Sequence, residues 1–142
     1  RLTFWINSYE IFKNHNGLIG AGTGDFRNEY KKINKKNTPT MPDTDNPHNM
    51  YVLELVQFGL IGIIILISIL FVQIQSAYVQ KDKFMKYTGI TLPLLFAVIM
   101  LSDSYLLGHY TGMLFIFFSS FLYKNYDVNH KKTFTNKIQF KH

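Results

Sequence analysis

A histidine at the start of a long apolar segment is the residue of this chain best suited to chemistry. His48 and Asn49 directly precede residues 50–72, a run of 23 residues in which Glu54 is the one charged residue. Because about 20 apolar helical residues cross a bilayer, this run is expected to span a membrane. His48 would then lie where water, headgroups and a membrane-bound substrate meet, and histidine exchanges protons near neutral pH. We predict a general base at His48, with a helix-capping or interfacial histidine as the structural alternative. Either His48 or Asn49 is well placed to cap the helix that follows.

The segment before His48 carries cationic groups suited to phosphate. Arg1 offers a planar fork of donors at fixed charge, which fits a phosphate or diphosphate. The alternative for Arg1 is a solvated terminal residue. Arg27 opens a basic stretch that ends at Lys35-Lys36, and such a stretch is by default a solvated face or a contact with lipid headgroups.

Four glycines at positions 17, 20, 22 and 24 make residues 17–26 a glycine-rich stretch. The dinucleotide fingerprint G-x-G-x-x-G is absent and no strand precedes the stretch, so a nucleotide site is not predicted. Two interpretations remain open. The stretch is either a structural turn joining two helices, or a loop in which Gly20, Gly22 and Gly24 offer backbone N–H groups to a phosphate.

Neither metal nor nucleic acid is predicted as a partner. His48 has no second ligand three or four residues away, the H-E-x-x-H pattern is absent, and the chain has no cysteine. The net charge of +6 comes largely from residues 124–142, where five lysines face Asp127 alone. Next to a membrane span, such a tail typically faces anionic lipid on the cytoplasmic side.

Hydrophobic periodicity and polar breaks predict an all-α integral membrane protein. We expect an amphipathic helix over residues 1–14, a polar helix over 27–36 and an irregular, proline-containing loop over 37–47. Transmembrane helices are expected at about residues 50–75, 85–101 and 105–123. Within the first of these, Gly59 and Gly62 are predicted to let a neighbouring helix approach closely.

The distribution of lysines predicts the orientation of these spans. Residues 80–87 hold three lysines, whereas the connection at residues 102–104 holds none. By the positive-inside rule, the lysine-bearing ends and the tail are cytoplasmic. Residues 1–49 then form an outer loop, which is periplasmic in a bacterium. Asp103 and His109 are expected on the same face as His48 and would approach it if the spans bundle, although tip residues are usually only solvated.

These residues together resemble the O-antigen ligase family, which also includes O-antigen polymerases and bacterial O-oligosaccharyltransferases. His48-Asn49 is separated by nine residues from Gly59-x-x-Gly62, as in the family's H-[N/S/Q]-x9-G-x-x-G pattern. Arg1 resembles the arginine that opens the family's large periplasmic loop. Residues 17–26 resemble its glycine-rich stretch, with Asn16-Gly17 where His-Pro is usual. The resemblance covers about residues 1–65 and suggests a C-terminal fragment.

The resemblance implies a bacterial inner-membrane, multi-pass glycosyltransferase with a GT-C-like helical bundle and an active site facing the periplasm. Such enzymes move a glycan from a polyprenyl-diphosphate carrier to an acceptor without a metal ion or cofactor. Carried onto this sequence, His48 would activate or position the acceptor hydroxyl, Arg1 would neutralise the diphosphate, and Asn49 would hold the loop. Arg27 is the candidate for a second diphosphate-binding arginine.

Among the activities of this family, transfer of an O-antigen-type glycan to the lipid A core is the prediction. Polymerisation of lipid-linked glycans and glycosylation of protein hydroxyls remain alternatives of the same class. A non-enzymatic membrane component for polysaccharide assembly or transport is the alternative of a different class.

Overall fold

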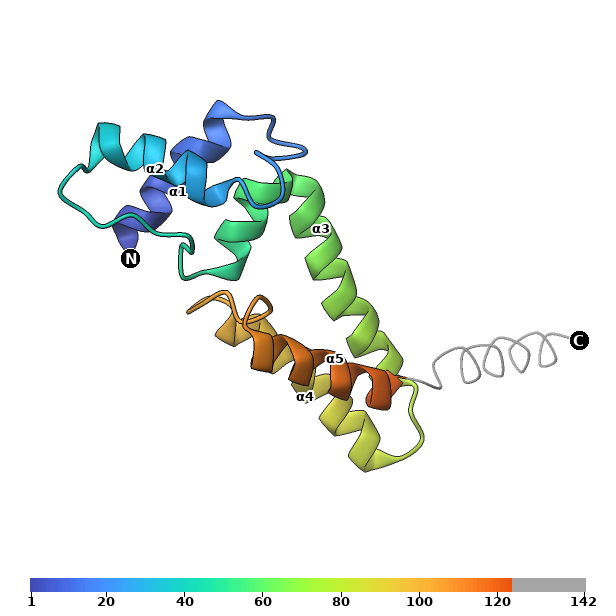
Figure 1. The fold of residues 1–142 in the computed structure, drawn as a ribbon. Coiled ribbons are helices and arrows are strands. Elements are labelled where there is room, and N and C mark those ends of the chain that lie inside the picture. Colours follow the sequence, from blue (N-terminus) through green and yellow to red (C-terminus); the bar gives the residue numbers. More distant parts are fainter. Residues whose placement is uncertain (124–142) are drawn as a thin grey trace, which may run out of the picture.

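The computed structural model describes residues 1–123, which fold into helices joined by loops (Figure 1). In chain order these are α1 (Leu2–Asn14), α2 (Phe26–Asn37), α3 (Met50–Tyr78), α4 (Lys83–Ile99) and α5 (His109–Tyr123). Extended structure in this part of the chain is limited to an isolated bridge between Asn16 and Gly20. The prediction of an all-helical fold is confirmed for these residues. The predicted basic tail, residues 124–142, lies outside them.

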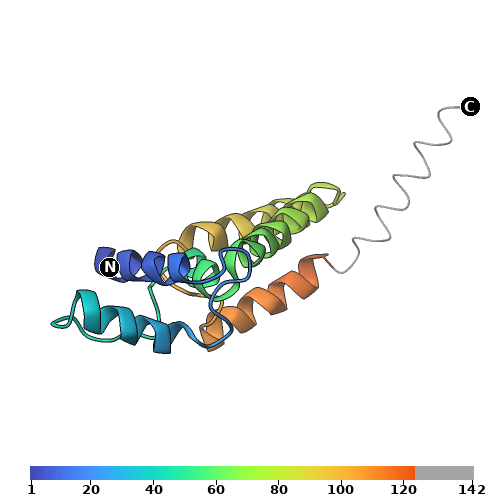
Figure 2. The same cartoon turned by 90° about the horizontal axis from the view of Figure 1, so that it is seen from above.

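The helices α1 and α2 cover the beginning of α3, whereas α4 runs back along α3 until its end meets Met50, and α5 packs beside both (Figure 1 and Figure 2). The first group has its own apolar core, to which all three helices contribute. Its buried members are Ile11, Phe26, Tyr30, Ile33, Leu53 and Val56. An ion pair across one turn of α2 joins the Glu29 Oε1 and Lys32 Nζ atoms, which are 2.6 Å apart. Both predicted helices before residue 38 are therefore confirmed.

A chain of buried amides ties the loop after α2 to both helices before it. Asn7 of α1 donates to the Thr38 hydroxyl at 2.8 Å, and that hydroxyl donates to Asn34 of α2 at 2.7 Å. Asn34 in turn donates to the carbonyl of Met41 and to the Asp43 carboxylate. Buried polar groups that are all satisfied favour one arrangement of the backbone. The irregular loop that leads to His48 is thus anchored at its beginning.

Gly59 interrupts α3 with non-helical torsions, φ 64° and ψ −155°. Residues 50–58 and 60–78 therefore form two helical segments that meet at a bend (Figure 1). A positive φ costs glycine little, because it has no Cβ, but is strained for other residues. The first glycine of the Gly59-x-x-Gly62 motif is consequently the point at which α3 changes direction.

The glycine-rich loop, residues 17–24, hydrogen-bonds the backbone groups that the break in α3 leaves unpaired. A break leaves carbonyls before it and N–H groups after it without intrahelical partners. This loop supplies both kinds of partner. The bonds run, donor first, from Ala21 to Val56 (2.8 Å), Gly22 to Gln57 (3.0 Å), Leu60 to Gly17 (2.9 Å) and Ile61 to Leu18 (3.2 Å). We call these four hydrogen bonds the glycine clamp.

The prediction that a helix packs against Gly59 and Gly62 is wrong. A Cβ built on Gly59 would lie 2.5 Å from the backbone of Leu18, so the loop occupies the space assigned to a helix. A Cβ on Gly62 would lie 2.5 Å from the Cβ of Phe58, one turn earlier on α3 itself. Small residues do permit close approach here, but to a loop and to the bend of the same helix.

The second part of the molecule is a bundle of α3, α4 and α5 around an apolar centre. The buried members are Met50, Leu66, Leu70, Phe96, Met100 and Phe115, with the rings of Phe96 and Phe115 4.6 Å apart. Polar contacts also cross the bundle: Gln73 donates to Ser119 at 3.0 Å, the Tyr51 hydroxyl to the Ala97 carbonyl at 2.8 Å, and the Tyr123 hydroxyl to the Gly89 carbonyl at 2.6 Å. The bundle therefore combines apolar packing with a few polar links, although the Oε1 atom of Gln73 is buried without a hydrogen-bond partner among residues 1–123.

One helix in the described part of the chain, α3, is long and apolar enough to cross a membrane. The shorter α4 and α5 have 17 and 15 residues. At about 1.5 Å per residue each falls somewhat short of a hydrocarbon core of about 30 Å. All three helices occupy the regions predicted as spans. Their crossing of a bilayer and the outer position of residues 1–49 stay predictions.

The third predicted span begins later than expected. Residues 105–108 form turns, and α5 starts at His109 instead of residue 105. The Tyr105 carbonyl accepts from the Gly108 N–H and from the Thr111 hydroxyl, which closes a compact loop before the helix. Apolar residues at 105–107 gave no sequence signal of this turn. The connection between α4 and α5 is therefore a structured loop, residues 100–108.

Candidate active site

Asn49 fixes the start of α3 against the end of α4. Its side-chain oxygen accepts from the Val52 N–H at 3.1 Å and so caps the helix. Its amide nitrogen donates to the Leu101 carbonyl at 3.1 Å, and the adjacent Met50 N–H donates to Met100. The predicted helix cap is thus present. Because Asn49 is buried and uses both ends of its amide, it holds the residue before it at the junction of two helices.

His48 has a left-handed backbone conformation, with φ 53°, and is the one non-glycine residue among the described ones with a positive φ. Its N–H donates to the Asn46 side-chain oxygen at 2.8 Å, and the Pro47 carbonyl accepts from the Trp5 indole at 3.0 Å. The imidazole is 38% exposed and lies beside the Phe4 ring, with centroids 5.9 Å apart. Backbone strain of this kind persists where surrounding contacts enforce it, and it clusters at functional sites.

A carboxylate from a residue that is distant along the chain lies next to His48. The Oδ1 atom of Asp103, in the α4–α5 loop, lies 3.3 Å from Nδ1 of His48. A carboxylate on one ring nitrogen holds the imidazole in one tautomer and leaves the other nitrogen, Nε2, for chemistry. The expectation that Asp103 approaches His48 is confirmed.

Asn46 joins these groups and was not singled out from the sequence. Its amide nitrogen donates to Asp103 at 3.1 Å, while its oxygen accepts from the Ser104 hydroxyl at 2.7 Å as well as from the His48 N–H. One amide therefore holds the backbone of the histidine and the carboxylate together. The only sequence signal was an asparagine before a proline, which indicates a turn and no more.

The charged form of Asp103 is stabilised by its neighbours. Burial alone would raise the pKa of this carboxyl, but the Ser104 N–H, the His48 imidazole and the Asn46 amide together hold the pKa below its ordinary value of 3.8. Hydrogen bonds to a charged carboxylate favour that form. Asp103 is consequently an anion beside His48 at neutral pH, ready to stabilise a positive charge on the ring.

Acidification is expected to remove the stabilising effect of Asp103. A carboxyl whose pKa is lower in the folded than in the unfolded protein stabilises the fold at a pH above its unfolded-state pKa, here 3.8. This stabilisation is lost as the pH falls through the folded-state pKa. The unfolding temperature of Asp103→Asn should therefore lie below that of the wild type at about pH 6. This difference in unfolding temperature should disappear at about pH 2. Asp45→Asn, in the preceding loop, is the matched control. A gap that does not change with pH would contradict the assignment.

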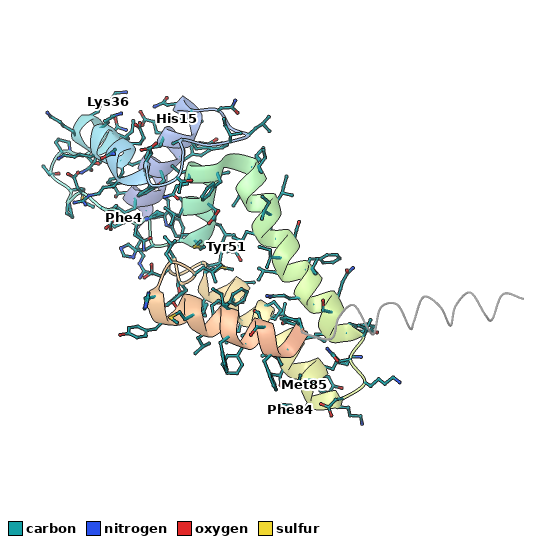
Figure 3. All side chains as sticks on the ribbon, turned by 45° about the vertical axis from the view of Figure 1, so that its right-hand side comes forward. Phe4, His15, Lys36, Tyr51, Phe84 and Met85 are labelled. Carbon is teal, nitrogen blue, oxygen red and sulfur yellow. The ribbon has the colours of Figure 1, made fainter. Side chains whose placement is uncertain are left out.

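Arg1 lies on the helical turn that contacts His48. It is the N-cap of α1 and precedes Phe4 and Trp5 by three and four positions, the spacing of neighbours on one helix face. Phe4 contacts the His48 ring and Trp5 binds the Pro47 carbonyl. Figure 3 shows Phe4 on the side of the α1–α2 pair that faces Tyr51 at the start of α3. Arg1 is exposed at this end of the molecule.

The remaining predicted site residues lie at the other end of the first segment of α3. Residues 50–58 separate His48 from the glycine clamp by about 14 Å at the helical rise per residue. Arg27 is exposed at the first turn of α2, directly after the glycine-rich loop. The structure thus divides the predicted set into two groups, with His48, Asn49 and Arg1 in one and Arg27 with the glycines in the other.

The glycines have contacts that match the structural alternative for their stretch. The N–H of Gly20 donates to Asn16 at 2.7 Å, and that of Gly22 donates to Gln57 within the clamp. A Cβ on Gly20 would lie 2.6 Å from the backbone of residues 56 and 57, whereas one on Gly24 would meet nothing within 4 Å. The N–H groups of Gly20 and Gly22 are therefore directed at protein carbonyls.

Glu54 and His109 each line a cleft. Glu54 lines an apolar cleft of about 520 Å³ along α3, with Phe58 and Ile61. His109 lines a cleft of about 430 Å³ in which polar and apolar groups are mixed, Asp103 among them. Within residues 1–123, no three His, Asp or Glu side chains gather as a set of metal ligands.

Comparison with known proteins yields one match. Residues 1–67 match the family model described as O-antigen ligase. No curated protein and no solved structure matches this chain. The matched segment contains Arg1, the glycine-rich loop, His48 and Gly59-x-x-Gly62, which are the residues on which the predicted resemblance rests. That resemblance is confirmed, and Asp103 lies beyond the matched segment.

Proposed function

Since residues 1–67 match the O-antigen ligase family, we propose that the protein transfers an O-antigen-type glycan from a polyprenyl-diphosphate carrier to the lipid A core. The family is one of glycosyltransferase-like, ligase-type enzymes, and it suggests a ligase or polymerase type of function. The observation that carries the proposal is the His48–Asp103 pair. A histidine with one nitrogen held by a carboxylate is the arrangement that proton abstraction from a hydroxyl needs.

The proposed reaction begins at Nε2 of His48. This atom takes the proton of the acceptor hydroxyl while the hydroxyl oxygen attacks the anomeric carbon of the carried glycan. The bond from that carbon to the diphosphate oxygen breaks, and its electron pair leaves with the polyprenyl diphosphate. The imidazolium that forms is stabilised by the Asp103 anion, which lies on its other nitrogen.

Arg1 neutralises the leaving diphosphate in this proposal. Negative charge develops on the bridging oxygen as the bond breaks, and a preorganised cation at that position lowers the barrier. The support for this role is that Arg1 is the N-cap of α1 and that Phe4, in the first turn of the same helix, contacts the His48 ring. Asn49 keeps His48 at the start of α3, and Arg27 is the candidate for a second diphosphate contact.

The proposed location is the bacterial inner membrane, with the site facing the periplasm. The family is membrane-associated, and α3 is an apolar helix of sufficient length. The donor is proposed to lie with its lipid in the bilayer and its diphosphate near Arg1. No metal is assigned a role, because proton transfer and charge neutralisation are both supplied by side chains.

A deletion strain tests the type of activity. For a ligase, long chains are expected to disappear from the lipid A core while carrier-linked chains remain. Accumulation of single repeat units would instead indicate a polymerase, and loss of glycan from proteins alone would indicate an O-oligosaccharyltransferase. Unchanged surface polysaccharide and glycoprotein would contradict all three.

Arg1→Ala in the intact protein is expected to reduce the rate of transfer about 10²-fold, the usual cost of removing one donor to a developing negative charge. Arg1→Lys keeps the charge but loses the planar fork, so an intermediate rate is expected. The measurement is transfer from a polyprenyl-diphosphate-linked glycan by purified protein. Lys13→Ala, at the opposite end of α1, is the control. Equal rates for Arg1→Ala and wild type would remove Arg1 from the mechanism.

A further inference from the structure

The α4–α5 loop forms a cleft with a mixed polar and apolar lining directly beside the His48–Asp103 pair. This loop cleft has a volume of about 430 Å³ and is lined by residues of the loop and the first turn of α5, together with Asn46. Small-molecule sites typically have volumes of about 300–1,000 Å³. Asp103 and Asn46 line the cleft and also contact His48, at its ring and at its backbone N–H. A group bound in the cleft would therefore lie next to the general base.

The lining of the loop cleft suits a sugar ring. Asn46, Asp103 and Ser104 contribute amide, carboxylate and hydroxyl groups, which are the partners that sugar hydroxyls require. Tyr105, His109 and Tyr110 contribute rings, and the C–H face of a sugar packs well on such surfaces. Tyr110 is 87% exposed although it is a large aromatic residue. Exposed aromatic residues among convergent polar groups indicate a binding surface.

The charged residues around His48 favour different locations for the donor diphosphate and for the acceptor sugar. The lining of the loop cleft holds the Asp103 anion and no Lys or Arg, so a diphosphate would be repelled there. Arg1 instead lies on the α1 side of the histidine, where the Phe4 ring is. The apolar cleft that Glu54 lines offers a sugar few hydrogen-bonding groups, because its other lining residues are apolar. The loop cleft therefore fits a neutral, hydroxyl-bearing ring better than a diphosphate or a lipid chain.

We propose that the loop cleft binds the acceptor sugar, with the attacked hydroxyl directed at His48. The donor diphosphate lies on the other side, toward Arg1. This inference rests on the proposed function and adds to it the surface that selects the acceptor. Residues of the α4–α5 loop, beyond the segment that matches the family, then determine which acceptor sugar is used.

The test uses Tyr110→Ala and His109→Ala in the purified full-length protein, because both side chains are exposed and their removal leaves the core intact. The KM for a lipid A core glycolipid is expected to rise roughly tenfold in the double variant, with kcat and the KM for the carrier-linked glycan within about twofold. Tyr87→Ala, an exposed tyrosine at the start of α4, is the matched control. An unchanged acceptor KM, or a rise in the donor KM instead, would overturn the proposal.

Direct binding keeps this test separate from the proposed function. The delipidated core oligosaccharide is titrated into wild type and the double variant by calorimetry, and a roughly tenfold loss of affinity is expected in the variant. If the wild type binds the oligosaccharide more tightly than the double variant but transfers no glycan, the proposed function fails, whereas the proposal that the loop cleft binds the acceptor sugar is supported. If glycan transfer occurs but both proteins bind alike, the inference about the loop cleft fails alone.

Discussion

Replacement of His48 by asparagine is expected to lower the rate of glycan transfer about 10²- to 10⁴-fold, the usual contribution of a general base. Asparagine is the suitable substitute because it tolerates the left-handed conformation that His48 adopts, φ 53°. The folded structure should therefore survive while the proton acceptor is lost. The measurement is the initial rate of transfer by purified protein, with the unfolding temperature determined in the same detergent.

Two comparisons make this result specific. His48→Ala should lose as much activity but also some stability, because alanine does not favour a positive φ. His15→Asn is the matched control, since His15 contacts the Ile11 carbonyl and Glu29 within the α1–α2 pair and has no part in the proposed site. Transfer at the wild-type rate by His48→Asn would show that the imidazole is not the base.

Gly59→Ala is expected to be the most destabilising substitution in the matched segment. The added Cβ would lie 2.5 Å from the Leu18 backbone, and φ is 64°, so the glycine-rich loop cannot stay docked. Backbone strain and loss of the glycine clamp together should lower the free energy of unfolding by on the order of 3 kcal/mol or more. Activity should fall as well, because the clamp sets the direction of the helical segment that follows His48.

Gly24→Ala is the matched control for this substitution. Gly24 also has a positive φ, 80°, but its added Cβ would meet nothing within 4 Å. It should therefore show only the cost of the left-handed conformation, about 1–2 kcal/mol. Thermal unfolding in detergent and the amount of protein in the membrane fraction measure both variants. Equal destabilisation by the two substitutions would show that the clamp contributes little.

Much of the fold follows from local sequence pattern. The apolar run after His48, the periodicity of residues 1–14 and the prolines before residue 48 each predict their element, because period, length and turn chemistry are properties of neighbouring residues. The nine-residue spacing between His48-Asn49 and Gly59-x-x-Gly62 likewise identified the family from a single stretch. The turn at residues 105–108 was missed, because Tyr105, Leu106 and Leu107 continue the apolar pattern of the helix that follows and outweigh the single turn residue, Gly108.

The relation between the two glycine motifs depends on tertiary structure. Residues 17–24 and Gly59 are far apart in the chain, and from the sequence each has several interpretations. In the structure the two motifs bind each other, because the backbone groups left unpaired at the break in α3 form hydrogen bonds with the glycine-rich loop. A backbone-to-backbone contact of this kind leaves no side-chain signature except the glycines that permit it.

The same distinction applies to the candidate active site. The sequence alone determined that His48 stands at the start of an apolar helix, that Asn49 can cap this helix, and that Arg1 begins the segment before it. Only the tertiary structure decided that the carboxylate beside His48 comes from Asp103, 55 residues later, and that Asn46 joins the two. Helix periods and caps are set within a few residues, whereas a pair of charges 3.3 Å apart is set by how whole helices pack.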